Sequence, residues 1–263
     1  MHPDEATSCN SVNTAETSNY RSMAMADAVA ADTSGDHDDE PMDLSGERRW
    51  RKRDGIITDY FSHRYTVQDQ ILCVGGQGTI KRAYDNYQEK PVAIKFFQKS
   101  KLSPRELSAA YQERDLMKKL KHQNCMELLD FYEDQKHICI IMDLMADDLR
   151  NVVNINDTPL DEEFARKLFV QMALAVDHCH SRNIVHRDIK LENFLVDVDK
   201  DTEEISIKIT DFGLSKEMSP GSKRIGKSGT MVCMAPEMIQ NKPYSASVDV
   251  WSLGVVLFEL LTN

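Results

Sequence analysis

The pattern of apolar and polar residues changes near residue 65. Residues 1–47 are rich in Ser, Thr, Asn, Asp and Ala and hold few large apolar side chains. Such a segment cannot bury enough surface to offset the entropy lost on ordering, so we expect it to be disordered. Beyond it, residues 65–83 predict two strands joined by a glycine turn at 75–78, and the apolar run 91–97 predicts a third, buried strand.

The balance then shifts from strands to helices. Residues 104–121 carry apolar side chains at helical spacing, which predicts an amphipathic helix, and residues 138–142 predict another strand. Residues 161–181 predict a second long helix. Residues 246–262 are apolar nearly all round, as expected for a helix buried inside a larger body. Strands followed by helices predict an α+β fold with two unlike lobes: a small β-rich lobe with one main helix, and a mainly helical lobe.

The net charge and its distribution along the chain argue against nucleic-acid binding. The formal net charge is −11, and residues 1–47 carry much of it, because acids such as Asp36 are accompanied there by a single base, Arg21. The remainder is close to neutral, so the chain lacks the basic face of a nucleic-acid-binding protein. A basic cluster at 48–53 fits a nuclear-import signal or a patch for anionic surfaces, and also a solvated linker; we interpret 48–64 as a basic linker.

The cysteines and the apolar runs indicate the compartment. Six cysteines are scattered without a C-x-x-C pair, which fits neither a zinc site nor a small disulfide scaffold and favours reduced thiols. No apolar run approaches the roughly 20 residues of a membrane span, and the N-terminus lacks the order of a signal peptide. We therefore expect a soluble cytoplasmic or nuclear protein that contacts no membrane.

Three groups of residues suggest chemistry. Gly75, Gly76 and Gly78 would let backbone amides approach phosphate oxygens, and Lys95 ends an apolar strand with its ammonium directed into a cleft. Alone, these are better explained as a hairpin turn and a lysine that reaches solvent. The third group is more specific: H-R-D-I-K-L-E-N at 186–193, D-F-G at 211–213, A-P-E at 235–237 and D-V-W-S-L-G at 249–254.

In this order, and over about 66–263, these motifs resemble the signatures of the eukaryotic protein kinases. The resemblance implies a bilobal kinase fold, with an N-lobe at about 65–142, a hinge at 143–149 and part of a C-lobe at 150–263. It also implies ATP and Mg²⁺ as cofactors and a protein with a serine or threonine hydroxyl as substrate. The A-P-E segment, which shapes a peptide-binding surface, disfavours a small-molecule kinase.

The resemblance assigns roles to individual residues. Lys95 would bind the α- and β-phosphates and be held by Glu113, Asp188 would accept or orient the proton of the substrate hydroxyl, and Lys190 would lie on the γ-phosphate. Asn193 and Asp211 would bind Mg²⁺, because a hard cation prefers carboxylate and amide oxygens. The ATP-binding residues would be Cys73, Gly75, Gly76, Gly78, Ile80, Ala93, Lys95, Asp143, Met145, Asp148 and Leu195.

Supporting roles follow from the same resemblance. Met142 would be the gatekeeper beside the adenine, and residues 143–145 the hinge whose backbone bonds its edge. Met117, His186 and Phe212 would stack as a spine between the lobes, and Asp249 would anchor the H-R-D backbone. A lysine two residues after Asp188, with Thr230 available to pair with it, resembles the serine/threonine kinases more than the tyrosine kinases.

Some positions depart from the family pattern. Cys73 stands in place of the first glycine of the loop, and Gln77 occupies the loop tip. The usual site of activating phosphorylation falls near Ile225 or Gly226, so Arg187 would lack its phosphate partner. Either a nearby serine (219, 222 or 228) substitutes, or the segment needs no phosphate. Glu192, with Asp148, would favour basic residues before the target hydroxyl.

Subfamily and chain length leave alternatives open. Residues 190–195 and 211–216 resemble the calcium/calmodulin-dependent kinase group, which we favour, whereas the short hinge resembles the mitogen-activated kinases. The chain stops just past the last motif, so the apolar residues of 246–262 would need cover from missing C-terminal helices or from a partner. We therefore expect a fragment. A catalytically impaired pseudokinase or nucleotide-binding scaffold is the alternative function.

Overall fold

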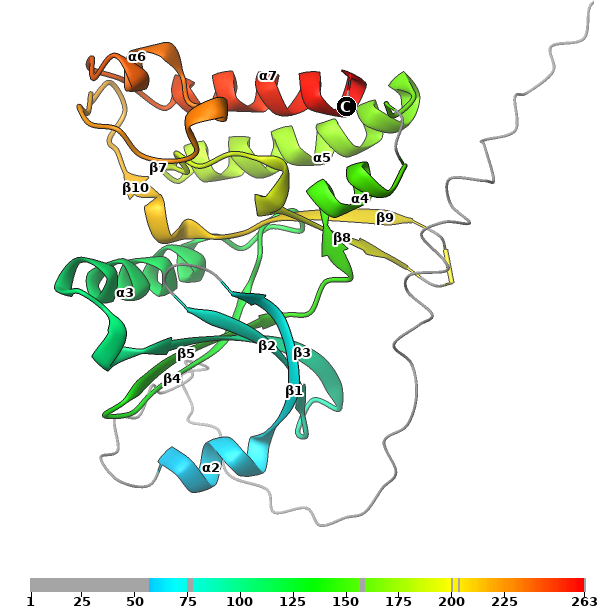
Figure 1. Ribbon diagram of the computed structural model, residues 1–263, viewed down its shortest axis with the longest axis vertical. Helices are drawn as coiled ribbons and strands as arrows, with labels where there is room; N and C mark the ends of the chain where they lie inside the picture. The colour runs from blue at the N-terminus through cyan, green and yellow to red at the C-terminus, as the bar shows by residue number, and fades with distance from the viewer. Residues whose placement is uncertain (1–56, 75–77, 157–158, 200, 203, 263) are drawn as a thin grey trace, which may run out of the picture.

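The computed structural model describes residues 57–262 apart from 75–77, 157–158, 200 and 203. The expected disorder of residues 1–47 and the basic cluster at 48–53 lie outside the described residues. Within them the predicted α+β, two-lobed fold is confirmed: Figure 1 shows a β-sheet with one long helix in the lower part and a mainly helical layer in the upper part.

The N-lobe is built on a five-stranded antiparallel sheet in the order β1-β2-β3-β5-β4. Alternate residues of the central strand β3 face opposite sides: Val92 and Ile94 pack on one face, and Ala93 and Phe97 on the other, toward the main core. Lys95 shares the second face, which therefore presents it toward the lobe junction. The strands are β1 (Tyr65–Val74), β2 (Thr79–Asp85), β3 (Lys90–Gln98), β4 (Leu128–Glu133) and β5 (His137–Asp143).

A helix precedes the sheet where the sequence predicted a linker. Helix α2 (Ile57–Arg64) lies in the second part of the range 48–64, and tertiary contacts hold it. Phe61 packs against the rings of Tyr65 and Tyr132, with centroids 5.4 and 5.2 Å away. Arg64 binds Asp85 at 3.2 Å and Asp130 at 2.7 Å. The linker at 48–64 stays a prediction, but residues 57–64 of it form a helix, because contacts that no local pattern displays hold them on the N-lobe.

The long N-lobe helix α3 (Pro104–Lys119) has a clear start. Ser103 caps it: the Ser103 hydroxyl accepts from the Glu106 amide at 3.3 Å, and the Ser103 amide donates to the Glu106 carboxylate at 2.8 Å. Proline at the first helical position lacks only an amide that the helix does not use. The buried residues Ala110, Glu113, Leu116 and Met117 follow the helical repeat and place Glu113 on the inward face.

The C-lobe is mainly helical, and two of its helices lie side by side (Figure 1). These are α5 (Glu162–Ser181) and α7 (Ser247–Thr262). Asp161 caps α5 by accepting from the amides of Glu163 and Phe164 at 2.9 and 3.1 Å. The shorter elements are α4 (Leu149–Asn156), α6 (Pro236–Ile239), the strands β6 (Asp147–Asp148), β8 (Phe194–Val198) and β9 (Ile205–Ile209) of one sheet, and the pair β7 (Ile184–Val185) and β10 (Lys216–Glu217).

Helix α7 is buried on one face only. Asp249, Leu253, Val256 and Leu260 lie in the interior. Val250, Trp251, Phe258 and Leu261 are exposed, so the cover that the sequence led us to expect is not supplied by the described residues. Among the described residues, no helix is long and apolar enough to cross a membrane.

Candidate active site

The centre of the site is a lysine held between two carboxylates. The Lys95 ammonium on β3 lies 2.7 and 2.9 Å from the two oxygens of Glu113 on α3, and 3.2 Å from Asp211 Oδ1. Lys95 and Glu113 are both buried. The two carboxylates come from opposite sides of the lobe junction, because Asp211 follows β9 of the C-lobe. The structure thus brings together three residues that are up to 116 positions apart in the sequence.

Burial and mutual charge set the ionisation of this group. Burial alone would lower the pKa of Lys95, but the negative charges of Glu113 and Asp211 outweigh it and raise the pKa above its ordinary value. The Lys95 charge lowers the pKa of Asp211 below its ordinary range. At neutral pH the junction therefore holds a fixed ammonium and an ionised aspartate, an arrangement suited to binding phosphate oxygens and a metal cation together.

The second cluster surrounds Asp188. Its Oδ1 accepts from the amide and from the hydroxyl of Thr230, both at 2.8 Å. Its Oδ2 lies 3.2 Å from Lys190 Nζ and accepts from Asn193 Nδ2 at 3.2 Å. Lys190 also donates to the Thr230 hydroxyl at 3.2 Å, which confirms the pairing that the sequence indicated. Asp188 is thereby oriented by three side chains, two of them within five residues along the chain.

The close approach of Thr230 to Asp188 requires glycine beside it. Gly229 has φ of +97°, and a Cβ there would lie 2.2 Å from the Arg187 carbonyl oxygen and 3.2 Å from Asp188 Oδ1. Any side chain would push the segment away from Asp188. The sequence indicated Thr230 but gave Gly229 no role, because the steric limit on a side chain at Gly229 comes from Arg187 and Asp188, which are distant in the sequence.

Asp249 holds the backbone that precedes Asp188. Its two carboxylate oxygens accept from the amides of His186 and Arg187, each at 2.8 Å, and His180 Nε2 lies 2.8 Å from Oδ2. Asp249 is fully buried. These bonds hold Arg187 at φ of +68°, a conformation that is costly for a non-glycine residue. The predicted anchoring role of Asp249 is confirmed.

Apolar side chains connect the lobes behind the charged groups. The rings of His186 and Phe212 meet edge to face with centroids 5.3 Å apart, and both are fully buried. Met117 of α3 lies in the same core cluster as Phe212. His186 Nε2 lies 3.0 Å from the Thr210 carbonyl oxygen, beside Asp211. The predicted spine residues are thus brought together, and they fix the position of the D-F-G segment.

The residues expected around the adenine lie on β2, β3, β5 and β8. Ala93 and Met142 are buried and paired across β3 and β5, whereas Ile80 and Leu195 are partly buried against the same core. A Cβ on Gly78 would lie 2.5 Å from the Phe96 carbonyl oxygen, so glycine is required there by β3. Cys73 is exposed at the end of β1. Gly75 and Gly76 lie outside the described residues.

The two carboxylates of the hinge, Asp143 and Asp148, bind other side chains of the protein. Asp143 receives Lys90 at 3.2 Å and Lys208 at 2.7 Å; despite burial, these lysines lower its pKa. Asp148 accepts from the amide and the side-chain amide of Asn151, at 2.9 and 3.1 Å, which caps the start of α4. Sequence reasoning placed Asp148 on the ribose and missed this cap. Met145 is partly buried against the main core, and a ribose contact from Asp148 stays a prediction.

The donor set for a cation consists of two side chains. The Asn193 amide nitrogen donates to the Asp188 carbonyl at 2.7 Å, so the Asn193 Oδ1 is directed away from Asp188. The Thr210 amide donates to the Asn193 carbonyl at 2.9 Å and brings Asn193 next to Asp211. Within the described part of the chain, no group of three or more His, Cys, Asp or Glu side chains could hold a metal. One carboxylate and one amide fit Mg²⁺, which commonly takes few protein ligands beside phosphate and water.

Several contacts of the site have no sequence signal. Gln112, next to Glu113 on α3, donates to the Ser215 carbonyl and accepts from Lys216. Arg187 donates to the Leu214 carbonyl at 2.9 Å and to the Tyr244 hydroxyl at 3.1 Å. These pairs are separated by many residues and unite different elements, so neither periodicity nor motif spacing could reveal them.

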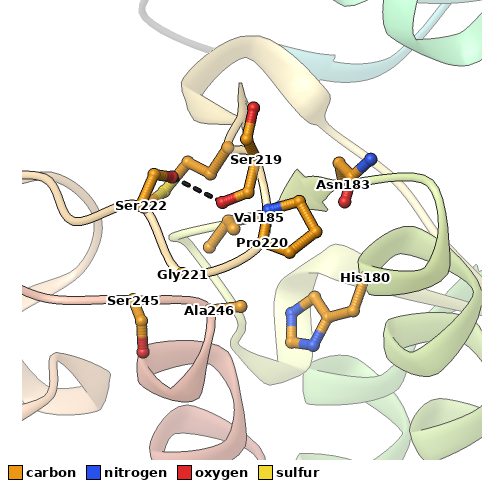
Figure 2. Close-up of a pocket in the computed structure, with 10 residues that line it drawn as sticks. His180, Asn183, Val185, Ser219, Pro220, Gly221, Ser222, Ser245 and Ala246 are labelled. Atoms are coloured by element: carbon orange, nitrogen blue, oxygen red, sulfur yellow. Dashed lines mark hydrogen bonds between the residues drawn. The ribbon is translucent and has the colours of Figure 1, made fainter.

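A separate cavity of about 210 Å³ lies in the C-lobe, and Figure 2 shows the residues that line it. Residues from the end of α5, from the segment after β10 and from the turn before α7 line it. His180 is one of them, and it connects this cavity to the site through Asp249. The Ser222 hydroxyl donates to the Ser219 carbonyl at 2.6 Å across one edge. None of the predicted site residues lines this cavity.

The two-lobed architecture, with its charged groups where the lobes meet, is that of a protein kinase domain. The sequence matches the protein kinase domain family over residues 66–263. The chain therefore belongs to the protein kinase family.

Curated relatives agree with the family. The chain is 33% identical over 199 residues to the serine/threonine-protein kinase TIO of Arabidopsis thaliana. It is 33% identical over 215 residues to a probable myosin light chain kinase of Dictyostelium discoideum, and 38% over 191 residues to the probable serine/threonine-protein kinase MARK-A of that organism. These alignments cover 74%, 82% and 72% of this chain, and only 15%, 53% and 18% of the relatives.

Proposed function

We propose that the chain is a serine/threonine protein kinase that transfers the γ-phosphoryl group of ATP to a hydroxyl of a protein substrate. One observation carries the proposal: Lys95 is already held by Glu113 and Asp211 across the lobe junction. Phosphoryl transfer needs groups that position phosphates and neutralise charge, and an assembled lysine pair is such a group.

The residues divide the work by position. Lys95 binds the α- and β-phosphates, and Glu113 keeps its ammonium in place. Asn193 and Asp211 would hold Mg²⁺, which would neutralise charge on the phosphates when bound. The oxygen of the substrate hydroxyl bonds to the γ-phosphorus while Asp188 accepts the hydroxyl proton. The bond from that phosphorus to the ADP oxygen breaks, and ADP leaves. Lys190, within 3.2 Å of Asp188, stabilises the charge on the transferred group.

The preference for serine and threonine rests on the C-lobe contacts. Lys190 donates a hydrogen bond to Thr230 beside Asp188. This is the pair by which the sequence resembles the serine/threonine kinases. The names of the similar proteins TIO and MARK-A support the same class. We also propose membership of the calcium/calmodulin-dependent kinase group, which residues 190–195 and 211–216 resemble. We further propose that the chain acts in the cytoplasm or nucleus.

The test compares two asparagine variants. Asp188→Asn removes the proton acceptor, whereas Asp201→Asn makes the same change at an exposed loop position. Incorporation of phosphate from Mg²⁺-ATP into serine and threonine peptides, and into the chain itself, should fall by about 10²–10⁴-fold in Asp188→Asn and stay unchanged in Asp201→Asn.

Two other results would contradict the proposal. Equal incorporation in both variants would exclude Asp188 from the chemistry. If the unmodified chain incorporates no phosphate while ATP still raises its melting temperature, it is a nucleotide-binding pseudokinase. The exposed Cys73 in the place of a loop glycine is the feature that makes this alternative worth testing.

A further inference from the structure

An arginine occupies the acidic pair beside the catalytic loop. Arg150, at the start of α4, lies with Nε 3.2 Å from Glu192 Oε1 and with Nη2 3.1 and 3.3 Å from the two oxygens of Glu259. Glu192 belongs to the turn Leu191–Asn193 and Glu259 to α7. One guanidinium thus joins three elements, and we call these residues the Arg150 cluster.

The cluster borders the path that a peptide must take to Asp188. Glu192 directly precedes Asn193, which binds Asp188. On the other side, Cys233 follows Thr230 by three residues, which is at most roughly 10 Å of chain. Burial and the charges of Glu259, Glu192 and Asp188 raise the pKa of Cys233 to about 11, and Arg150 opposes them. The Ser252 hydroxyl of α7 donates to the Cys233 carbonyl at 2.7 Å, so this segment packs on the helix that carries Glu259.

The cluster bears on the expectation that Glu192, with Asp148, favours basic residues before the target hydroxyl. Glu192 was expected to attract a basic residue of the substrate, but its carboxylate is bound to an arginine of the same chain. Two carboxylates and one guanidinium leave a formal charge of −1 instead of −2. Without Arg150, the two acids would form a ready site for a substrate lysine or arginine.

We propose that Arg150 is a specificity-determining residue, which occupies the acidic pair and so lets the enzyme accept peptides that lack a basic residue near the target hydroxyl. This inference rests on the proposed kinase function. Arg150 is tethered beside the acids, at an effective concentration on the order of millimolar or above, so a peptide arginine competes poorly with it. Displacement would also leave the Arg150 charge unpaired and close to the incoming cation.

The experiment measures how each variant discriminates between matched peptides. A set of serine peptides carries either arginine or alanine at each position flanking the serine. Their binding is followed by fluorescence anisotropy, and their phosphorylation by kcat/KM. The variants are Arg150→Gln, the double variant Arg150→Gln/Glu192→Gln, and the control Arg166→Gln. Arg166 also pairs with a glutamate, Glu162, but on the exposed surface of α5.

The unmodified chain and Arg166→Gln should prefer arginine over alanine by no more than about fivefold at any position. Arg150→Gln should raise this preference by about tenfold or more at one or more positions, because a charge-assisted bond becomes available to the peptide. The added change Glu192→Gln should remove most of the gain. Arg150→Lys, which keeps the charge but cannot bind both carboxylates as a fork, should give a smaller gain and tests the same point if Arg150→Gln folds poorly.

A strong arginine preference in the unmodified chain, left unchanged by Arg150→Gln, would overturn the inference. So would an Arg150→Gln variant that folds and gains no preference. The binding measurement keeps this result separate from the proposed function: a chain that binds the peptides with the expected preferences but phosphorylates none of them would refute catalysis and uphold the role of Arg150.

Discussion

Two groups of charges in this molecule have the same composition and different surroundings. In the lobe junction, Lys95 lies between Glu113 and Asp211; at the edge of the C-lobe, Arg150 lies between Glu192 and Glu259. The exposed fractions of the Lys95, Glu113 and Asp211 side chains are 10%, 3% and 44%, whereas those of Arg150, Glu192 and Glu259 are 28%, 45% and 26%. Each group has one cation and two carboxylates, and the main difference is the burial of the cation and of one carboxylate, Glu113, in the junction.

The comparison separates a group whose geometry is fixed from a group whose residues can be substituted at little cost in stability. Water cannot replace a lost partner inside the junction, so Lys95 and Glu113 are fixed with respect to each other. At the edge, water and substrate charges can replace a partner, so the net charge of the cluster can change without loss of the fold. The first group suits catalysis and the second suits selection among substrates.

The largest loss of stability should come from breaking the buried ion pair between Lys95 and Glu113. Glu113→Ala leaves Lys95 inside the junction with Asp211 as its remaining partner, and we expect the free energy of unfolding to fall by about 3 kcal/mol. Urea denaturation measures this. Asp115→Ala, on the same helix but at an exposed ion pair, should change it by no more than about 0.5 kcal/mol. Equal losses in the two variants would show that burial does not separate these groups.

An intermediate effect should come from the ion pairs of α2. Arg64 binds Asp85, whose side chain is 2% exposed, and Asp130, whose side chain is 14% exposed. Arg64→Ala leaves two carboxylates close together and one of them buried, so the free energy of unfolding should fall by about 2 kcal/mol. A chain without residues 57–64 should lose at least as much. If neither change affects the urea midpoint, α2 is not part of the stable domain.

The smallest effect on stability should come from the edge. Arg150→Gln should lower the free energy of unfolding by no more than about 1 kcal/mol, although it changes substrate preference. The measurement is again urea denaturation, with Arg166→Gln as the matched control. A loss as large as that of Glu113→Ala would mean that the Arg150 cluster holds the C-lobe together, and the contrast between the two groups would disappear.

Much of the fold follows from local pattern. The strands at 65–83, 91–97 and 138–142 and the helices at 104–121, 161–181 and 246–262 all lie where the sequence predicted them, within a few residues. Their apolar residues repeat with the period of the element that forms. Helix α2, strand β4 and helix α4 were not predicted, because they are short and owe their stability to contacts with residues distant in the sequence.

The residues of the site also divide into those that the sequence identified and those that only the structure shows. The motifs around Asp188 and Asp211 are continuous, so their members were identified from the sequence alone. The pairing of Lys95 with Glu113 came from resemblance to a family, since nothing local links a strand to a helix 18 residues later. Arg150 and Glu259 are 109 residues apart and belong to no motif, so only the structure could bring them together.

Gln112 has a consequence for motion. Its side chain binds the Ser215 carbonyl and Lys216, and its neighbour Glu113 binds Lys95. A displacement of the chain after the D-F-G motif therefore pulls on α3, and through α3 on Lys95. We expect α3 and the chain just after the D-F-G motif to move together, so that the Lys95 ammonium and the residues that follow Asp211 reach their places in the same event.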